Sequence, residues 1–273
     1  MALAREEVKP LKRIGYRRRV AARRAIFVAP FGELADARRL ARLAEEAEAH
    51  GWDGFFVWDH LVYTATRELA DPWVAMSAIA CATERVRIGA LVTPTPRRRI
   101  QKLARETVTL DRLSGGRLVF GVGIGGDRHG EFVPFGDSGD PRERARLLDE
   151  GLDRLVELWG GEFEPPPAQQ PRIPVWVAAR WPNRRPMRRA ARWDGIFPID
   201  LPGPEALAEV VAAIGELRAG ATGPFDFVVQ SPAGTDPGPW EQAGATWCLS
   251  SFGAAPTEAE VREAIGAGPR AAG

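Results

Sequence analysis

The stretch from Thr109 to Gly136, TLDRLSGGRLVFGVGIGGDRHGEFVPFG, contains the residues of this chain whose types and spacing are best suited to chemistry. Its glycines at positions 121, 123, 125 and 126 carry no Cβ, so a flat or anionic ligand can approach the backbone closely. Asp127, His129 and Glu131 follow within five positions, and each can exchange protons. The stretch therefore combines a surface open to a ligand with a group of acids and bases.

The residues around these glycines predict a helix end, a strand and a loop. Residues 110–113 close an apolar-periodic helix, and Ser114-Gly115-Gly116 supply the left-handed turn that ends it. Residues 117–122 then predict a buried strand. The titratable residues thus lie just beyond the carboxyl end of a strand, which is where α/β folds place their sites.

Short apolar runs separated by amphipathic stretches recur along the chain. They predict eight strands, over residues 25–29, 53–57, 86–92, 117–122, 175–179, 195–199, 225–230 and 245–250. Apolar strands that alternate with helices indicate a parallel sheet covered by helices. Eight such units in about 250 residues favour an α/β fold of the (β/α)8 TIM-barrel type, as a single domain with short loops. A doubly wound open sheet is the alternative fold.

The predicted helices have clear end signals. Asp36 to Ala49 is closed by Gly51, and Asp71-Pro72 opens a second helix. Capping boxes are predicted at Asp140, with Glu143 as its acid, and at Thr257, with Glu260. The proline-rich connection 160–174 is the least regular part and could hold an extra strand or a small insertion.

Composition and charge exclude several classes of function. The net charge of +1 gives no reason to expect nucleic acid or membrane as a partner, and no apolar run reaches the roughly 18 to 20 residues that span a bilayer. Residues 1–24 form an Arg-rich N-terminal extension without the apolar core of a secretory signal, and residues 25–273 form the barrel domain. We therefore expect a cytoplasmic protein.

The cysteines and histidines argue against metal chemistry. Cys81 and Cys248 lie far apart in apolar surroundings, which favours two buried, unpaired thiols over a disulfide or a metal site. Three histidines cannot supply the ligand set of a metal-dependent barrel hydrolase, so no metal is expected. The glycines after residue 120 follow three βα units, so they are not the dinucleotide fingerprint of a first βα unit.

In a barrel, the loops after the strands form the mouth and supply the site. These loops are rich in aromatic, basic and glycine residues, in the segments Pro30-Phe31-Gly32, Trp58-Asp59-His60, Thr93-Pro94-Thr95-Pro96-Arg97, 123–131 and Arg180-Trp181-Pro182-Asn183. Such a mouth suits a planar heteroaromatic ring held by backbone contacts, with an anionic tail bound by amides and arginines. Among the arginines at 97–99, Arg97 is the one expected near a phosphate or a substrate anion.

From about Ala25 onward the chain resembles the bacterial luciferase-like flavin monooxygenase superfamily, which also contains oxidoreductases dependent on the deazaflavin coenzyme F420. The matching segments, in order, are AEEAEAHGWDGFFVWDH, RVRIGALVTPTP, ARETVTLDRLSGGRLVFGVGIGG, EFVPFG and PPPAQQPRIPVWVAARWPNRRPMRRAARWDGIFPI. Their order and spacing together are specific. The resemblance implies a (β/α)8 barrel that binds FMN or F420 in its mouth, usually as a homodimer.

The resemblance also assigns roles to single residues. His60 matches a histidine that in many relatives faces the flavin ring, with Asp59 beside it, and an imidazole there can bond a ring atom in either protonation state. Ala90-Leu91 aligns with a strand position where relatives often have a non-prolyl cis peptide behind the ring. Thr93, Gly123 and Gly125 complete the cofactor-binding residues on this side of the mouth.

On the opposite side, Ala179-Arg180-Trp181 aligns with a loop that in relatives is commonly a glycine pair that binds the cofactor phosphate. This chain departs from that pattern, so either Arg180 supplies part of the anion contact or the phosphate lies elsewhere.

The loop after the fourth predicted strand departs from the family as well. Gly126 occupies the position of an active-site glutamate in the F420-dependent sugar-phosphate dehydrogenases, which disfavours that substrate class. Asp127 or His129 could replace the missing acid, whereas a solvated loop histidine is an equally simple interpretation of His129. Glu131 matches an element that shapes this loop and is interpreted as structural.

We therefore expect a flavin-dependent monooxygenase that uses externally reduced FMN and O2 on a small organic substrate. An F420-dependent hydride-transfer oxidoreductase, in which O2 plays no part, is the first alternative. A non-catalytic flavin-binding protein of the same fold is the second. Because no nicotinamide fingerprint is present, a separate flavin or F420 reductase is the expected source of electrons.

Overall fold

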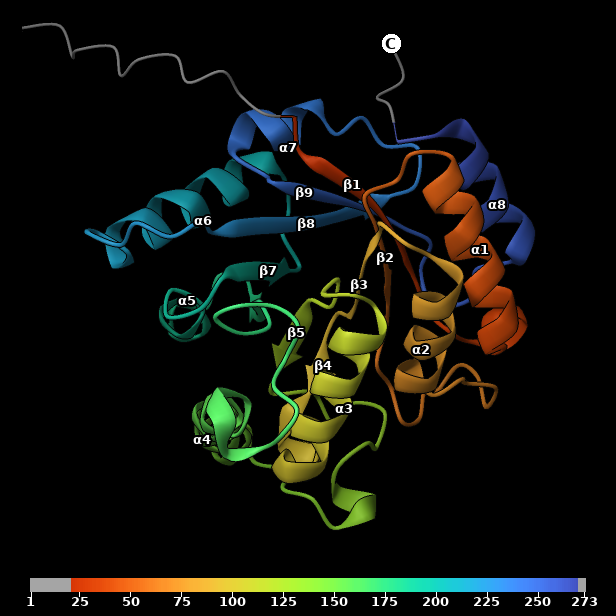
Figure 1. Ribbon diagram of the computed structural model, residues 1–273. Coiled ribbons are helices and arrows are strands. Elements are labelled where there is room, and N and C mark those ends of the chain that lie inside the picture. Colours follow the sequence, from red (N-terminus) through yellow and green to blue (C-terminus); the bar gives the residue numbers. More distant parts are fainter. Residues whose placement is uncertain (1–20, 270–273) are drawn as a thin grey trace, which may run out of the picture.

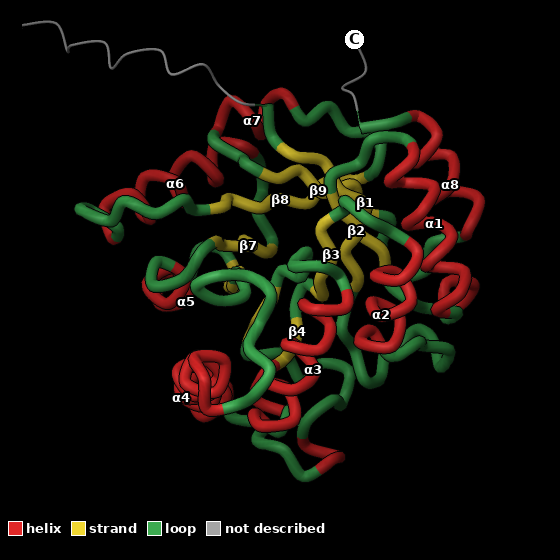
Figure 2. Tube along the Cα trace, in the orientation of Figure 1, coloured by secondary structure: helices red, strands yellow, loops and turns green. Residues whose placement is uncertain are grey.

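The predicted apolar runs are the strands of one parallel sheet that rolls into a barrel (Figures 1 and 2). The computed structural model describes residues 21–269. Its strands are β1 (Arg23–Val28), β2 (Gly54–Val57), β3 (Arg87–Ala90), β4 (Thr93–Pro94), β5 (Phe120–Gly123), β6 (Val175–Arg180), β7 (Gly195–Ile199), β8 (Asp226–Pro232) and β9 (Trp247–Ser251). They follow the order β3-β2-β1-β9-β8-β7-β6-β5-β4. Most of the predicted extension 1–24 lies outside the described residues.

The two ends of this sheet meet, which makes it a (β/α)8 barrel as predicted. The third predicted strand, 86–92, is split into β3 and β4, and β3 approaches β5 through a parallel bridge between Ile88 and Leu118. The amide of Val119 donates to the carbonyl oxygen of Ile88 at 2.8 Å and closes the ring. The non-prolyl cis peptide lies at Leu91–Val92, so its expected position at Ala90-Leu91 was wrong by one residue.

Helices surround the strands, as Figures 1 and 2 show. They are α1 (Ala37–Ala49), α2 (Pro72–Ala82), α3 (Ile100–Leu113), α4 (Pro141–Glu157), α5 (Arg184–Ala190), α6 (Pro204–Leu217), α7 (Gly238–Ala243) and α8 (Glu258–Ala267). Short 3-10 turns at Gly32–Leu34, Thr95–Arg97 and Val133–Phe135 lie in the loops after β1, β4 and β5, and a π-turn, Leu158–Glu162, follows α4.

The helix ends mostly match their sequence signals. The side chains of Asp36, Asp71 and Asp140 accept backbone N–H groups at the starts of α1, α2 and α4. Thr257 and Glu260 form the predicted capping box of α8. The capping box predicted for α4 was wrong, because Glu143 pairs with Arg146 on the next turn.

The structure decides two further points, the content of the connection 160–174 and the burial of the two cysteines. The connection 160–174 contains no strand, and its contacts to the barrel include hydrogen bonds from the Gln169 side-chain amide to Asp111 and to the carbonyl oxygen of Leu118. Cys248 is buried as expected, but Cys81 is exposed, because it lies on a face of α2 that the neighbouring helices leave uncovered. Among residues 21–269, no helix is long and apolar enough to cross a membrane.

Large side chains fill the inside of the barrel. The interior cluster contains Phe27, Phe56, Trp176 and Trp247, whereas the other faces of the strands pack against the helices. The Trp176 and Trp247 rings, 5.4 Å apart between centroids, come from the first two residues of their strands and close the amino-terminal end. A barrel filled in this way leaves its carboxyl-end loops as the place for a site.

Gly121 lies where β5 packs closely against β3. A Cβ at this position would overlap the carbonyl oxygen of Ala90, whereas a Cβ at Gly126 would meet nothing within 4 Å. We expect Gly121→Ala to lower the free energy of unfolding by about 1–3 kcal/mol or more, since backbone cannot move aside as a side chain can. Gly126→Ala is the matched control. Equal stability of the two variants in urea unfolding would contradict this account.

Candidate functional site

A buried network of ion pairs joins the loops that follow β2, β4 and β5. The carboxylate of Asp59 lies 2.8 Å from the Arg97 guanidinium and 2.9 Å from that of Arg98. The same Arg97 side chain, which is 5% exposed, reaches Glu131 at 2.8 Å. Arg97 was expected near a phosphate or a substrate anion, and the structure places its guanidinium between the carboxylates of Asp59 and Glu131.

Glu131 is the branch point of this network. Its Oε1 atom accepts from the Leu61 amide and from Arg97, both at 2.8 Å, and its Oε2 atom lies 2.9 Å from Nδ1 of His60. Burial by itself raises the pKa of this carboxyl. The hydrogen bonds from His60 and the Leu61 amide, with the charges of His60 and Arg97, outweigh burial and lower the pKa to about 2.

His60 consequently has one ring nitrogen that is hydrogen-bonded and one that is free. An ionised carboxylate can only accept, so Nδ1 of His60 donates to Glu131. Within residues 21–269, Nε2 has no hydrogen-bond partner. The His60 side chain is 25% exposed, so a ligand can reach it from the mouth.

An aromatic cluster surrounds the His60 ring. The ring centroids of Phe31, Trp58, Tyr63 and His129 lie 5.1 to 6.0 Å from that of His60. Trp58 also packs against Phe27, which belongs to the barrel interior. The indole N–H of Trp58 is buried without a partner among the described residues, and so is the Thr93 hydroxyl. Flat apolar faces beside an unused donor are what a planar heteroaromatic ligand requires.

His129 and Asp127, both proposed from the sequence, have different surroundings. His129 stacks on Tyr63 at 4.1 Å and joins the cluster, and partial burial together with the nearby charge of His60 lowers its pKa. Asp127 accepts from the amides of Phe132 and Val133 and so holds the loop in shape. His129 is therefore placed beside His60, whereas the carboxylate of Asp127 is occupied by its own loop.

The glycines at the end of β5 face protein atoms. A Cβ at Gly123 would lie 2.7 Å from the Val92 side chain, and one at Gly125, which has a φ of +68°, would lie 2.5 Å from the Phe132 ring. Their lack of a side chain lets neighbouring segments pack closely. Ala90 and Leu91 are buried, and Leu91 belongs to the barrel interior.

The loop after β6 carries the remaining predicted cofactor residues. Ala179 is buried within β6, and the amide of Trp181 donates to the carbonyl oxygen of Ile199 at 2.9 Å. The Arg180 side chain is 64% exposed and ion-paired with Asp200 at the end of β7. The Arg180 guanidinium is therefore accessible to solvent at the end of β6.

Sequence reasoning undervalued two members of the site. Glu131 was interpreted as structural, although it holds His60, and Tyr63 was not singled out at all. Both lie in loops after strands whose path the sequence does not encode locally. Asp59 was expected to act with His60, yet its oxygens accept from Arg97 and Arg98 and make no contact with the imidazole.

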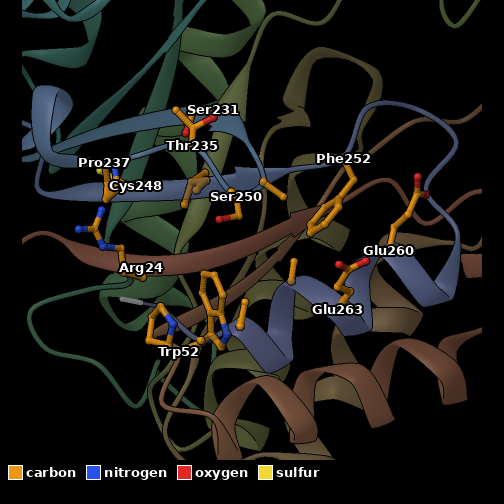
Figure 3. A pocket seen from close by; sticks show the side chains of 17 residues that line it. Arg24, Trp52, Ser231, Thr235, Pro237, Cys248, Ser250, Phe252, Glu260 and Glu263 are labelled. Atoms are coloured by element: carbon orange, nitrogen blue, oxygen red, sulfur yellow. The ribbon is translucent and has the colours of Figure 1, made fainter. Parts of the chain in front are cut away.

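A cavity of about 590 Å³ lies away from this mouth, on the outside of the barrel between β9 and α8 (Figure 3). Arg24, Trp52, Cys248, Ser250 and Glu263 are among its lining residues. Burial raises the pKa of the Cys248 thiol to about 11, so this thiol stays protonated and unreactive. None of the predicted site residues lines this cavity.

Comparisons with known proteins agree on a family. Residues 19–265 match the family of luciferase-like monooxygenases. The F420-dependent glucose-6-phosphate dehydrogenase of Nakamurella multipartita is 36% identical over 129 residues, which cover 45% of this chain and 37% of that protein. The oxygenase component of the flavin-dependent trigonelline monooxygenase of Acinetobacter baylyi is 29% identical over 160 residues, covering 53% and 43%.

A solved structure shows the same fold over most of its length. The monooxygenase RslO1 from Streptomyces bottropensis superposes with a TM-score of 0.73 at 18% identity, over 89% of this chain and 96% of that one. The chain spans a smaller part of its curated relatives. The aligned segments cover 37 to 60% of the length of the relatives compared.

The lowered pKa of Glu131 predicts a specific loss of stability in acid. The folded pKa of about 2 lies below the ordinary value of 4.5. The ionised carboxylate therefore stabilises the fold above pH 4.5, and this stabilisation is lost as the pH falls through 4.5 toward 2. We expect the stability difference between the native protein and Glu131→Gln to shrink by about 3 kcal/mol across this range. Urea unfolding at several pH values measures it, and parallel pH profiles would contradict the assignment.

Proposed function

Because this chain belongs to the family of luciferase-like monooxygenases, we propose that it is an oxidoreductase that oxygenates a small organic molecule. In this proposal the chain uses O2 and FMN, and a separate reductase delivers the FMN in reduced form. The observation that carries the proposal is the His60 imidazole at the mouth, with Nδ1 held by Glu131 and Nε2 free among aromatic rings.

The residues at the mouth fit a flavin or deazaflavin ring. The Trp58 indole N–H and the Thr93 hydroxyl are buried donors without partners among the described residues, and Phe31, Trp58 and Tyr63 offer flat faces. Arg180, exposed beside Asp200, would contact the anionic tail. When bound, such a cofactor would supply the electron- or hydride-transfer chemistry of the reaction.

The chain's own residues would position reactants and move a proton. The free Nε2 of His60 would hold or transfer a proton at the reacting atoms, a role worth about 10²–10⁴-fold in rate. Phe31, Tyr63 and His129 pack on the His60 ring and would limit the access of water to it. Arg97 and Arg98 would stay in the ion-pair network and leave the substrate to other groups.

A second candidate is F420-dependent hydride transfer, which the 36% identity to the glucose-6-phosphate dehydrogenase favours. Gly126 argues against sugar phosphates as its substrate, since it stands where the F420-dependent sugar-phosphate dehydrogenases have an active-site glutamate. Both candidates place the cofactor ring at the same mouth. They differ in whether O2 takes part.

Cofactor titration with a pair of histidine variants tests the proposal. We expect the purified protein to bind FMN or F420 and to accelerate oxidation of the reduced form, by O2 or by an organic acceptor. His60→Asn should retain binding and lose about 10²–10⁴-fold in turnover. His50→Asn is the matched control, because His50 ends α1 and bonds the carbonyl oxygen of Glu46.

Cofactor binding and stopped-flow turnover are measured for the native protein, His60→Asn and His50→Asn. Failure to bind either cofactor would overturn the functional assignment. Binding without any acceleration would instead identify a non-catalytic flavin-binding protein of the same fold. Equal turnover in His60→Asn and the native protein would remove His60 from the mechanism.

We also propose a homodimer that associates through α2 and α3. A groove of about 440 Å³ lies between these helices, and its rim carries Val74, which is 62% exposed, and Leu113, which is 48% exposed. Burying such side chains in a partner is favourable, since each fully buried aliphatic side chain contributes about 1.5–3 kcal/mol. The homodimer is supported by these exposed side chains together with the family membership.

Introduction of a negative charge on this surface tests the proposed dimer interface. Sedimentation equilibrium should give a dimer for the native protein and a monomer for Val74→Glu, because an unpaired carboxylate would be buried at the contact. Leu217→Glu on α6 is the control, since Leu217 is 47% exposed and outside the groove. A native monomer, or a Val74→Glu dimer, would refute the interface.

A further inference from the structure

We propose that Glu131 is a positioning residue that fixes the tautomer of His60. By accepting the Nδ1–H bond, it leaves the lone pair of Nε2 directed at the mouth, where the proposed function places the reacting atoms. The part of this inference that concerns turnover rests on the proposed function. The tautomer itself does not, because it is a property of the protein alone.

For a neutral His60, the hydrogen bonds at Glu131 allow only the Nδ1–H tautomer. Oε1 accepts from the Leu61 amide and from Arg97, and both of these donors carry hydrogens that cannot be removed. Oε2 faces Nδ1 of His60 at 2.9 Å, and as a carboxylate oxygen it must accept there as well. The side chain is 3% exposed and its pKa is lowered to about 2, so it stays ionised at neutral pH.

The carboxylate is also fixed in space. Arg97 connects it to Asp59, and Arg98 holds the far side of Asp59 at 2.9 Å. A rotation of Glu131 would break the 2.8 Å contact to Arg97 and leave charges unpaired in a buried place, which is costly. Asp59 therefore acts on His60 only through Arg97 and Glu131.

The other groups that face His60 leave this assignment unchanged. Phe31 and Trp58 pack on the ring without hydrogen bonds to it, and Tyr63 and His129 contact it through their rings at 5.1 and 5.7 Å. His129 directs its Nδ1 to Thr64 instead. Within residues 21–269, Glu131 is the hydrogen-bond partner of His60.

Replacement of Glu131 by glutamine should reverse the tautomer. The single amide oxygen of glutamine is needed by the Leu61 amide and Arg97, because both can only donate. The amide NH2 group must then face His60 and donate to Nδ1. His60 would carry its hydrogen on Nε2, and the lone pair would point away from the mouth.

Nitrogen-15 NMR of the histidine side chains measures this directly in the cofactor-free full chain. The chain has three histidines, and His60→Asn identifies the His60 signals. At an alkaline pH that keeps the imidazoles neutral, we expect His60 to show the Nδ1–H tautomer in the native protein and the Nε2–H tautomer in Glu131→Gln. His50, whose Nδ1 lies 2.8 Å from the Glu46 carbonyl oxygen, is the internal reference for Nδ1–H. Glu143→Gln, on the exposed face of α4, is the matched control and should leave His60 unchanged.

An Nε2–H tautomer in the native protein, or an unchanged tautomer in Glu131→Gln, would overturn the proposal. If Glu131→Gln does not fold, the native spectrum still decides. Once an active cofactor is known, Glu131→Gln should lower kcat by roughly 10²-fold with little change in KM, since proton transfer is affected and binding is not. Because the NMR measurement needs no cofactor, failure of the tautomer assignment is distinguishable from failure of the proposed function.

Discussion

The buried chain of charges from Arg98 through Asp59 and Arg97 to Glu131 is the interaction on which the mouth of this barrel depends. Two carboxylates and two guanidinium groups are brought out of water together, and each is tolerated because its neighbours neutralise it. Loss of one member would leave an unpaired charge at low exposure, at a cost of about 3–5 kcal/mol. The network therefore fixes the loops after β2, β4 and β5 relative to one another.

The barrel brings these loops within reach of each other. His60 and Glu131 are 71 residues apart in sequence, yet both follow strands whose carboxyl ends open at the same mouth. The approach of β5 to the third predicted strand depends on Gly121, where any side chain would meet the Ala90 carbonyl. The barrel thus brings Glu131 to Nδ1 of His60, and because the carboxylate accepts there, Nε2 is the imidazole nitrogen left free.

The sequence predicted the barrel well because its signals are local. Each signal involves residues that are near neighbours in the sequence. Examples are the alternating apolar runs, the helix caps Asp36 and Asp71, and the capping box of Thr257 and Glu260. The site was harder to predict, because Glu131 reads as a loop residue until the fold places it against His60. The pairing of Arg97 with Asp59 and Glu131 was not predicted, because it depends on how the loops meet in the fold. The cis peptide lies one bond later than the alignment with relatives placed it.

In the proposed function the cofactor binds at the mouth against His60. Titration of FMN or F420 into the protein, followed through the histidine side-chain NMR signals, measures whether it does. We predict that the signals of His60 and His129 shift with cofactor concentration while those of His50, at the end of α1, stay in place. Saturable cofactor binding that leaves the His60 signals unchanged would contradict the account, because the ring would then lie elsewhere on the barrel.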